Sequence, residues 1–137
     1  MRQLTRLIKI TSFFIGIVIL IFFGCHKDEH RYIYLQNKSN KAIYYGLSSS
    51  YPDTSLTKIE DHPGNNGSIA YKVKSDNKTT LPAAFFELNS TIQLFIFDSD
   101  IIENNPWDSI VKHYLILKRY QFTELDMEKL DWTISYK

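Results

Sequence analysis

The chain has 137 residues, of which 44% are hydrophobic, 15% aromatic and 23% charged, with 16 basic residues, 15 acidic residues and one cysteine. No clustered basic surface of the kind that nucleic-acid-binding proteins use is evident, so we expect no nucleic-acid partner. The length fits one domain with a modest hydrophobic core that needs no disulfides.

The first 24 residues have the layout of a secretory signal. Arg2, Arg6 and Lys9 precede the apolar run of residues 13–23, and Gly24 follows it. A basic head, a short apolar middle and a small residue at the cut site are typical of signal peptides. A membrane-spanning helix needs about 20 apolar residues, and this run is too short for one. We therefore expect residues 1–24 to be removed.

Cys25 stands directly after the expected cut site. This arrangement resembles a bacterial lipoprotein signal peptide, and it implies that Cys25 becomes the first mature residue and carries palmitate or similar acyl chains. An ordinary secretory signal would leave a lone thiol in an oxidising compartment. Phe22 and Phe23 occupy places where the common bacterial pattern has Leu and a small residue. Such a relaxed pattern before the cysteine resembles those of Bacteroidota-type lipoproteins. Two or more acyl chains would hold the protein at a membrane for practical purposes permanently.

The charged residues after Cys25 carry a second resemblance. Lys27, Asp28 and Glu29 are similar to the export signal that sends Bacteroidota lipoproteins to the outer face of the outer membrane. The resemblance implies an outer-membrane, lipid-anchored protein at the cell surface. The alternative is that residues 25–30 form only a solvated, charged tether. Residues 31–137 then form a single β-rich domain.

The mature part of the chain is slightly acidic. The first 24 residues contain three of the 16 basic residues and no acidic residue, so 13 basic and 15 acidic residues remain, a net charge of −2.

The first half of the domain alternates between strand and turn signals. Residues 31–35 and 42–47 are rich in Tyr, Ile and Leu, and the polar residues 37–40 between them predict a hairpin. Residues 48–53 form a loop, because Pro52 does not suit a central strand. Residues 68–74 alternate apolar and polar side chains and predict a half-buried strand.

The second half predicts a central strand, two helical turns and a closing strand. Residues 91–97 are apolar on both faces, as in a central strand. Pro106 suits a first helical turn, and residues 113–119 are either the tail of that helix or a weak strand. Thr123 and Asp126 predict the cap of a second helix, and residues 132–136 alternate as a strand. We expect a mainly β fold, a small β-sandwich or barrel of six to seven strands with one or two short helices.

Four segments of the mature chain together carry a family resemblance. They are similar to landmarks of a group of small, uncharacterised Bacteroidota lipoproteins. The resemblance implies class and location, and it brings no activity. The segments are residues 51–53, 105–108, 117–120 and 130–134.

Candidate catalytic and metal-binding groups are few. The acidic residues that follow the central strand could supply oxygen ligands for calcium, but they lack the glycine and regular ligand spacing of a calcium loop. We favour a solvated acidic loop. These residues are Asp98, Asp100, Glu103 and Asp108.

Other active-site arrangements are also weak. Asp98 and Glu87 could be imagined as a glycosidase pair, but pairs arise freely among 15 acidic residues. His62 and His113 lack metal-ligand spacing, and no Ser or Cys stands in a nucleophile motif. We expect no catalytic activity, no cofactor and no metal.

Binding is better supported than catalysis. Tyrosines gather in the first third of the chain, and exposed tyrosines suit binding surfaces because they are rigid and amphipathic. We select Tyr44, Tyr45, Tyr51 and Trp107 as candidate binding aromatics, and we expect one or two of the tyrosines to be exposed.

Residues 108–110 resemble the acceptor of Bacteroidota protein O-glycosylation, which implies a glycan on Ser109. The alternative is that Asp108 caps the local helix.

The sequence therefore favours a surface-exposed, lipid-anchored, non-enzymatic domain that binds an extracellular protein or glycan. The alternative is a periplasm-facing immunity or inhibitor lipoprotein that acts against an envelope toxin. An enzyme is the third reading.

Overall fold

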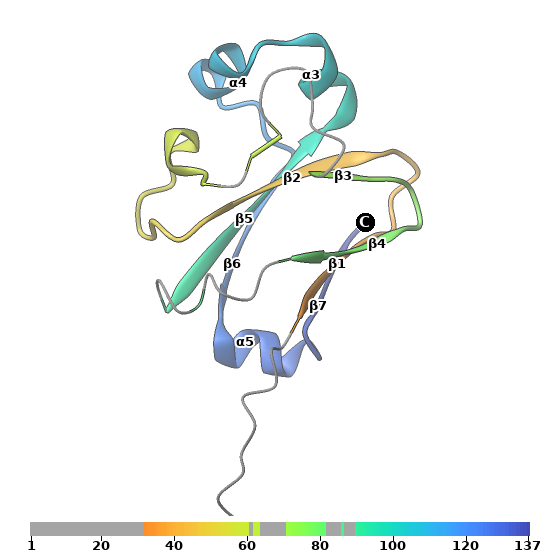
Figure 1. The fold of residues 1–137 in the computed structure, drawn as a ribbon, viewed down its shortest axis with the longest axis vertical. Coiled ribbons are helices and arrows are strands. Elements are labelled where there is room, and N and C mark those ends of the chain that lie inside the picture. Colours follow the sequence, from red (N-terminus) through yellow and green to blue (C-terminus); the bar gives the residue numbers. More distant parts are fainter. Residues whose placement is uncertain (1–31, 61, 64–70, 82–85, 87–89) are drawn as a thin grey trace, which may run out of the picture. The chain divides into compact units, whose positions relative to one another are not determined.

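The computed structural model describes residues 32–60, 62–63, 71–81, 86 and 90–137. Residues Arg31–Lys137 form one compact unit, shown in Figure 1, and its elements are as follows. The strands are β1 (Ile33–Asn37), β2 (Ile43–Ser48), β3 (Lys72–Val73), β4 (Lys78–Leu81), β5 (Thr91–Asp98), β6 (Lys118–Thr123) and β7 (Thr133–Tyr136). The helices are the 3₁₀ turn η1 (Leu56–Lys58), α3 (Ser99–Asn104), α4 (Trp107–His113) and α5 (Glu124–Lys129).

The described strands form two sheets (Figure 1). A three-stranded sheet has the order β4-β1-β7, and a four-stranded sheet has the order β3-β2-β5-β6. All the strand pairs are antiparallel except β1 with β7, which is parallel. The chain is therefore mainly β, and its two-sheet arrangement fits the small β-sandwich that the sequence predicts.

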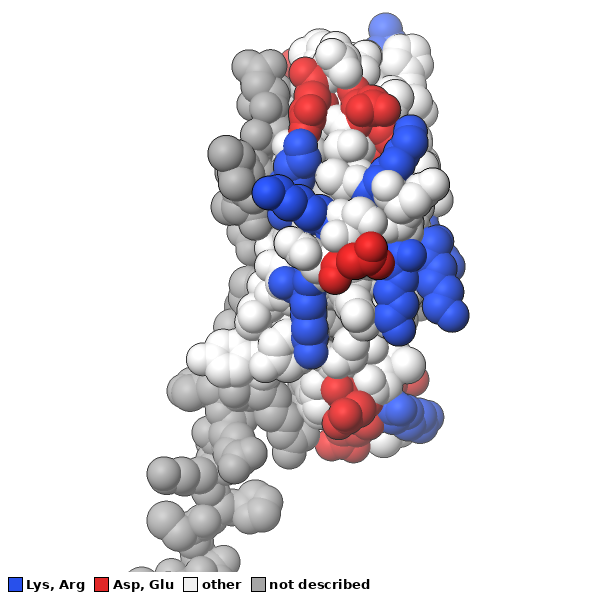
Figure 2. All heavy atoms as spheres, turned by 90° about the vertical axis from the view of Figure 1, so that its right-hand side faces the viewer, with Lys and Arg blue, Asp and Glu red and all other residues white. Residues whose placement is uncertain are grey.

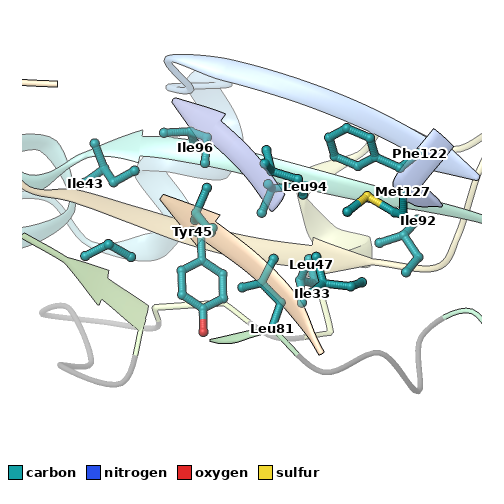
Figure 3. Packing of buried hydrophobic residues seen from close by; sticks show 13 residues of the cluster. Ile33, Ile43, Tyr45, Leu47, Leu81, Ile92, Leu94, Ile96, Phe122 and Met127 are labelled. Atoms are coloured by element: carbon teal, nitrogen blue, oxygen red, sulfur yellow. The ribbon is translucent and has the colours of Figure 1, made fainter. Parts of the chain in front are cut away.

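The main core lies between the two sheets. Leu35, Leu81 and Ile134 come from the three-stranded sheet and meet Leu94 and Ile96 of β5. Figure 3 shows side chains of both sheets pointing into this space. Removal of apolar surface from water stabilises the fold by about 25 cal/mol per Å², so this contact favours folding.

A second core covers the other face of the four-stranded sheet. Tyr44 of β2 and Phe95 and Phe97 of β5 pack there against Leu56 of η1 and residues of α3 and α4. Because both faces of β5 are covered, its residues from Ile92 to Phe97 are all buried. The prediction of a central strand at residues 91–97 is confirmed.

The C-terminal helix begins as the sequence predicts. Thr123 accepts a hydrogen bond from the Asp126 backbone N–H at 3.2 Å, and the Asp126 carboxylate accepts one from the Thr123 N–H at 3.0 Å. This reciprocal capping box satisfies two backbone donors that a helix start leaves open. Strand β7 follows the helix at the expected position.

The predicted hairpin of residues 31–35 and 42–47 is wrong. The two segments form β1 and β2, but these strands lie in different sheets. β1 alternates buried and half-buried residues, so it suits a sheet with one open face. β2 is buried at every position and requires cover on both faces. The turn between them therefore crosses from one sheet to the other.

Two other segments differ from the predictions. Only Lys72 and Val73 of the predicted strand 68–74 belong to β3, and residues 68–70 lie outside the described part. The acidic segment after β5 is not a loop, because residues 99–104 form α3. Asp98 caps this helix and accepts from the backbone N–H of Asp100 at 2.7 Å. The described part thus contains three α-helices, where we predicted one or two.

Candidate functional site

Two of the four candidate binding aromatics are buried. Tyr44 is 2% exposed and Tyr45 is 5% exposed. They are neighbours on β2, so their side chains point to opposite faces and enter the two different cores. The prediction that they contribute to an exposed binding surface is wrong.

Trp107 is half-buried at the start of α4. Its ring stacks on His62 at a centroid distance of 4.5 Å and meets the edge of Phe97 at 5.6 Å. Packing against two rings gives Trp107 a structural role in the second core.

Tyr51 is the exposed member of the four, at 44%. It lies in a turn in which the Asp53 N–H donates to the Ser50 carbonyl at 2.9 Å. Tyr114 is 43% exposed and its hydroxyl donates to the Thr54 carbonyl at 3.2 Å, so it lies next to the same loop. A binding role for Tyr51 stays a prediction.

The remaining predicted sites divide into two groups. Cys25, Lys27, Asp28 and Glu29 lie outside the described residues. Ser109 is half-buried in the first turn of α4, where its N–H donates to the Pro106 carbonyl at 3.0 Å. Its glycosylation stays a prediction.

The acidic residues considered as calcium ligands have local partners. Asp98 caps α3, and Asp100 lies 3.5 Å from Lys41 Nζ. Glu103 binds Lys72 and Tyr44. Among the residues with described positions, no group of three or more His, Cys, Asp or Glu side chains could hold a metal ion.

The most strongly coupled titratable groups belong to Tyr44, Lys72 and Glu103. The Tyr44 hydroxyl donates to Glu103 Oε1 at 3.0 Å, and Lys72 Nζ donates to the same oxygen. The hydrogen bond from Lys72 lowers the pKa of Glu103, and the bond from Tyr44 adds to this effect. Burial raises the pKa of Tyr44, and its bond to Glu103 raises it further.

This cluster fixes α3 against β2 and β3. A carboxylate with a lowered pKa stays ionised at neutral pH, whereas a general acid needs a raised pKa. The geometry is therefore that of a structural ion pair supported by a phenol.

An open polar surface lies on the outer face of the three-stranded sheet. We name it the tyrosine face. Its residues alternate with the core residues of the same strands, and the register places them side by side across β4, β1 and β7. They are Tyr34, Gln36, Lys78, Thr80, Thr133 and Ser135.

The tyrosine face differs from the outer face of the other sheet. There η1, α3 and α4 contribute to a second core, whereas neither hydrophobic cluster of the described residues includes a residue of the tyrosine face. Tyr34 and Gln36 are half-buried and Thr80 is exposed. Tyr32, which precedes β1 and is 59% exposed, is counted with the tyrosine face from here on. The surface thus offers an aromatic ring, an amide and hydroxyl groups on one face of a sheet.

Sequence reasoning missed this surface, although its signal is present. Tyr32, Tyr34 and Gln36 alternate with Ile33 and Leu35. That pattern places the tyrosines on the wet face of a half-buried strand. β2 lacks such alternation.

No family model, no curated protein and no solved structure matches this chain. No helix among the described residues is long and apolar enough to cross a membrane.

Proposed function

We propose that this protein is a lipid-anchored, non-enzymatic binding domain of the outer membrane that faces the outside of the cell and binds its partner through the tyrosine face. The observation that carries the proposal is the tyrosine face itself. Tyrosine side chains supply rigid, amphipathic contact area, and an open sheet face with such residues suits recognition.

The position of β1 supports the anchoring part of the proposal. Tyr32 is seven residues after Cys25. Seven residues span at most about 25 Å when fully extended. A lipid on Cys25 would therefore keep the start of β1 close to the bilayer, and β1 would lead from there towards the opposite end of the sheet.

The lipid anchor and the surface location are tested with a C-terminally tagged full chain in cells. Incorporation of labelled fatty acid is compared for wild type, Cys25→Ala and the triple variant with Lys27, Asp28 and Glu29 changed to Ala. Protease shaving of whole cells follows. We expect wild type to be lipidated and shaved, the triple variant to be lipidated and protected, and Cys25→Ala to take up no label. Wild type that is lipidated but never shaved would overturn the surface location.

The binding surface is tested by adhesion of the same cells to immobilised polysaccharides and proteins. We expect Tyr32→Ala/Tyr34→Ala to lose adhesion. The matched control is Tyr51→Ala/Tyr114→Ala, which removes two exposed tyrosines elsewhere. Loss of adhesion only in the control would move the binding surface to the loop around Tyr51. Surface amounts of each variant are measured by shaving.

A further inference from the structure

A group of lysines borders one end of the tyrosine face. Two come from the turns between β1 and β2 and between β3 and β4, and the third is the first residue of β4 and belongs to the tyrosine face. We name Lys38, Lys74 and Lys78 the lysine rim. Ser75 Oγ donates to the Ser39 carbonyl at 2.6 Å, and the Asn37 N–H donates to the Asn77 carbonyl at 2.9 Å. These bonds place the two turns side by side.

The lysines of the rim outnumber the acidic residues of the same turns. Residues 37–42 and 74–78 contain four lysines and one acidic residue, Asp76. Lys41 pairs with Asp100 at 3.5 Å, whereas the three lysines of the rim form no ion pair with any described residue. Figure 2 shows basic side chains gathered on this side of the molecule, with acidic ones mostly towards its two ends. Since the mature chain is net negative, the rim is a local concentration of positive charge.

The backbone beneath the rim is held firmly. Asn37 is fully buried, and its Nδ2 donates to the carbonyls of Lys41 at 2.7 Å and Val73 at 3.1 Å. Its Oδ1 accepts from the Ser39 N–H at 3.0 Å. One side chain therefore ties both turns together. A fixed arrangement of charges lowers the entropy lost when an anionic partner binds.

The rim continues onto the tyrosine face. Lys78 Nζ lies 3.7 Å from the centre of the Tyr34 ring. Lys78 also stands directly opposite Gln36, which has Ser135 on its other side. A cation, an aromatic ring, an amide and a hydroxyl thus occur together on one surface.

We propose that the tyrosine face binds an acidic polysaccharide, whose carboxylate or sulfate groups pair with the lysine rim. This proposal rests on the proposed function, and it adds the class of ligand. The C–H face of a sugar ring packs on a tyrosine, its hydroxyls bond to amides and hydroxyls, and its acidic group requires a cation. Tyr32, which is 59% exposed, supplies the ring, because Lys78 already lies over the ring of Tyr34. The tyrosine face and the rim supply the amide, the hydroxyls and the cations.

The test measures binding of the lipidated mature protein in detergent to immobilised polygalacturonate, chondroitin sulfate and neutral dextran. Poly-glutamate and vesicles with anionic headgroups are the competing probes. The variant is Lys38→Ala/Lys74→Ala/Lys78→Ala. The matched control is Lys58→Ala/Lys112→Ala/Lys129→Ala, which removes three exposed lysines of η1, α4 and α5. Thermal unfolding shows whether each variant is folded.

We expect wild type to bind at least one acidic polysaccharide, not dextran, with affinity that falls as salt rises. The rim variant should lose about tenfold or more in affinity, since it removes three cations that would pair with the acidic groups of the ligand. The control should bind like wild type.

Three results would overturn this proposal. They are equal binding to dextran, equal loss in the control, and tighter binding to poly-glutamate or vesicles than to either acidic polysaccharide. Its failure is distinguishable from failure of the proposed function. Adhesion that depends on Tyr32 and Tyr34 but involves a neutral polysaccharide or a protein would leave the binding function standing and would remove the acidic ligand.

Discussion

The Tyr44 hydroxyl donates a hydrogen bond to Glu103 Oε1 at 3.0 Å and thereby joins the middle of the four-stranded sheet to α3. The two residues are 59 positions apart in the sequence. Lys72 of β3 binds the same carboxylate oxygen and lies 5.5 Å from the centre of the Tyr44 ring. One carboxylate thus connects three elements that are distant in the chain.

Tyr44→Phe tests the contribution of this hydrogen bond. The ring stays in the second core, and only the hydroxyl is removed. We expect a loss of about 1 kcal/mol in the free energy of unfolding, the usual net value for one such bond. Urea denaturation measures it. Tyr32→Phe is the control, because Tyr32 is 59% exposed, and it should change stability by less than about 0.5 kcal/mol. Equal effects of the two variants would contradict a specific role for the Tyr44 hydroxyl.

Glu103 should make stability depend on acidic pH. The hydrogen bonds from Lys72 and Tyr44 lower its pKa in the folded protein below the ordinary value of 4.5. The stabilisation is therefore fully present above pH 4.5 and is lost as the pH falls through the lower folded pKa. Unfolding of wild type and Glu103→Gln is compared between pH 7 and pH 3. We expect the difference between the two proteins to shrink towards low pH, and a difference that does not change with pH would contradict this role.

The elements that the sequence predicts correctly depend on local signals. β5 is recognisable because both of its faces are apolar, and α5 because Thr123 and Asp126 form a capping box within four residues. β7 alternates cleanly along its length. In each case the residues that determine the structure lie within the element or next to it.

The errors concern relationships between distant segments. The polar turn after β1 resembles a hairpin turn. However, the Asn37 side chain donates to the carbonyl of Val73, 36 residues away. This bond joins the two sheets at the point where the chain crosses from one to the other. In the sequence, Tyr44 and Tyr45 resemble the exposed tyrosines of a binding surface. In the fold, residues of α3 and of the opposite sheet pack against them. Neither hydrophobic core formed by the described residues includes a residue of the tyrosine face. A single sequence does not specify which face of a strand a distant segment will cover.

The capping box gives a prediction that is independent of the site. Thr123→Ala removes the oxygen that accepts from the Asp126 N–H, so we expect a loss of about 1 kcal/mol in the free energy of unfolding. Thermal unfolding measures it. The effect should exceed that of Thr80→Ala, a control at an exposed threonine of β4 whose side chain has no hydrogen bond with a described residue. A smaller effect at Thr123 than at Thr80 would contradict the cap.

Among the polar residues that hold the two turns beneath the lysine rim, Asn37 should cause the largest loss of stability when it is substituted. Asn37→Ala removes both donors and leaves the buried carbonyl of Val73 without its side-chain partner. The expected loss is about 3 kcal/mol, because an unsatisfied buried group costs roughly 1–3 kcal/mol in addition to the lost bonds. Ser39→Ala, which removes one of the groups that bind Asn37 Oδ1, should cost less. Amide hydrogen exchange should increase in the turns on either side of Asn37, and unchanged exchange there would contradict its role.

Unlike the substitutions above, replacement of Gln93 by methionine should not destabilise the folded protein. Its side chain is fully buried, and its Nε2 donates to the Asp53 carbonyl at 2.7 Å, but its Oε1 has no hydrogen-bond partner among the described residues. Gln93→Met keeps the approximate length and volume of the side chain and removes the unsatisfied oxygen. Asp53 is exposed, so water can replace the lost donor at its carbonyl. Because the penalty of the buried oxygen is removed together with one hydrogen bond, we expect the free energy of unfolding to rise by between zero and about 1 kcal/mol in the Met variant.

Gln93→Ala is the matched comparison, since it also removes the amide but leaves a cavity, and it should destabilise by about 2 kcal/mol. A Met variant as unstable as the Ala variant would show that the Gln93 amide is satisfied, and that its bond to the loop carrying Tyr51 is needed for stability.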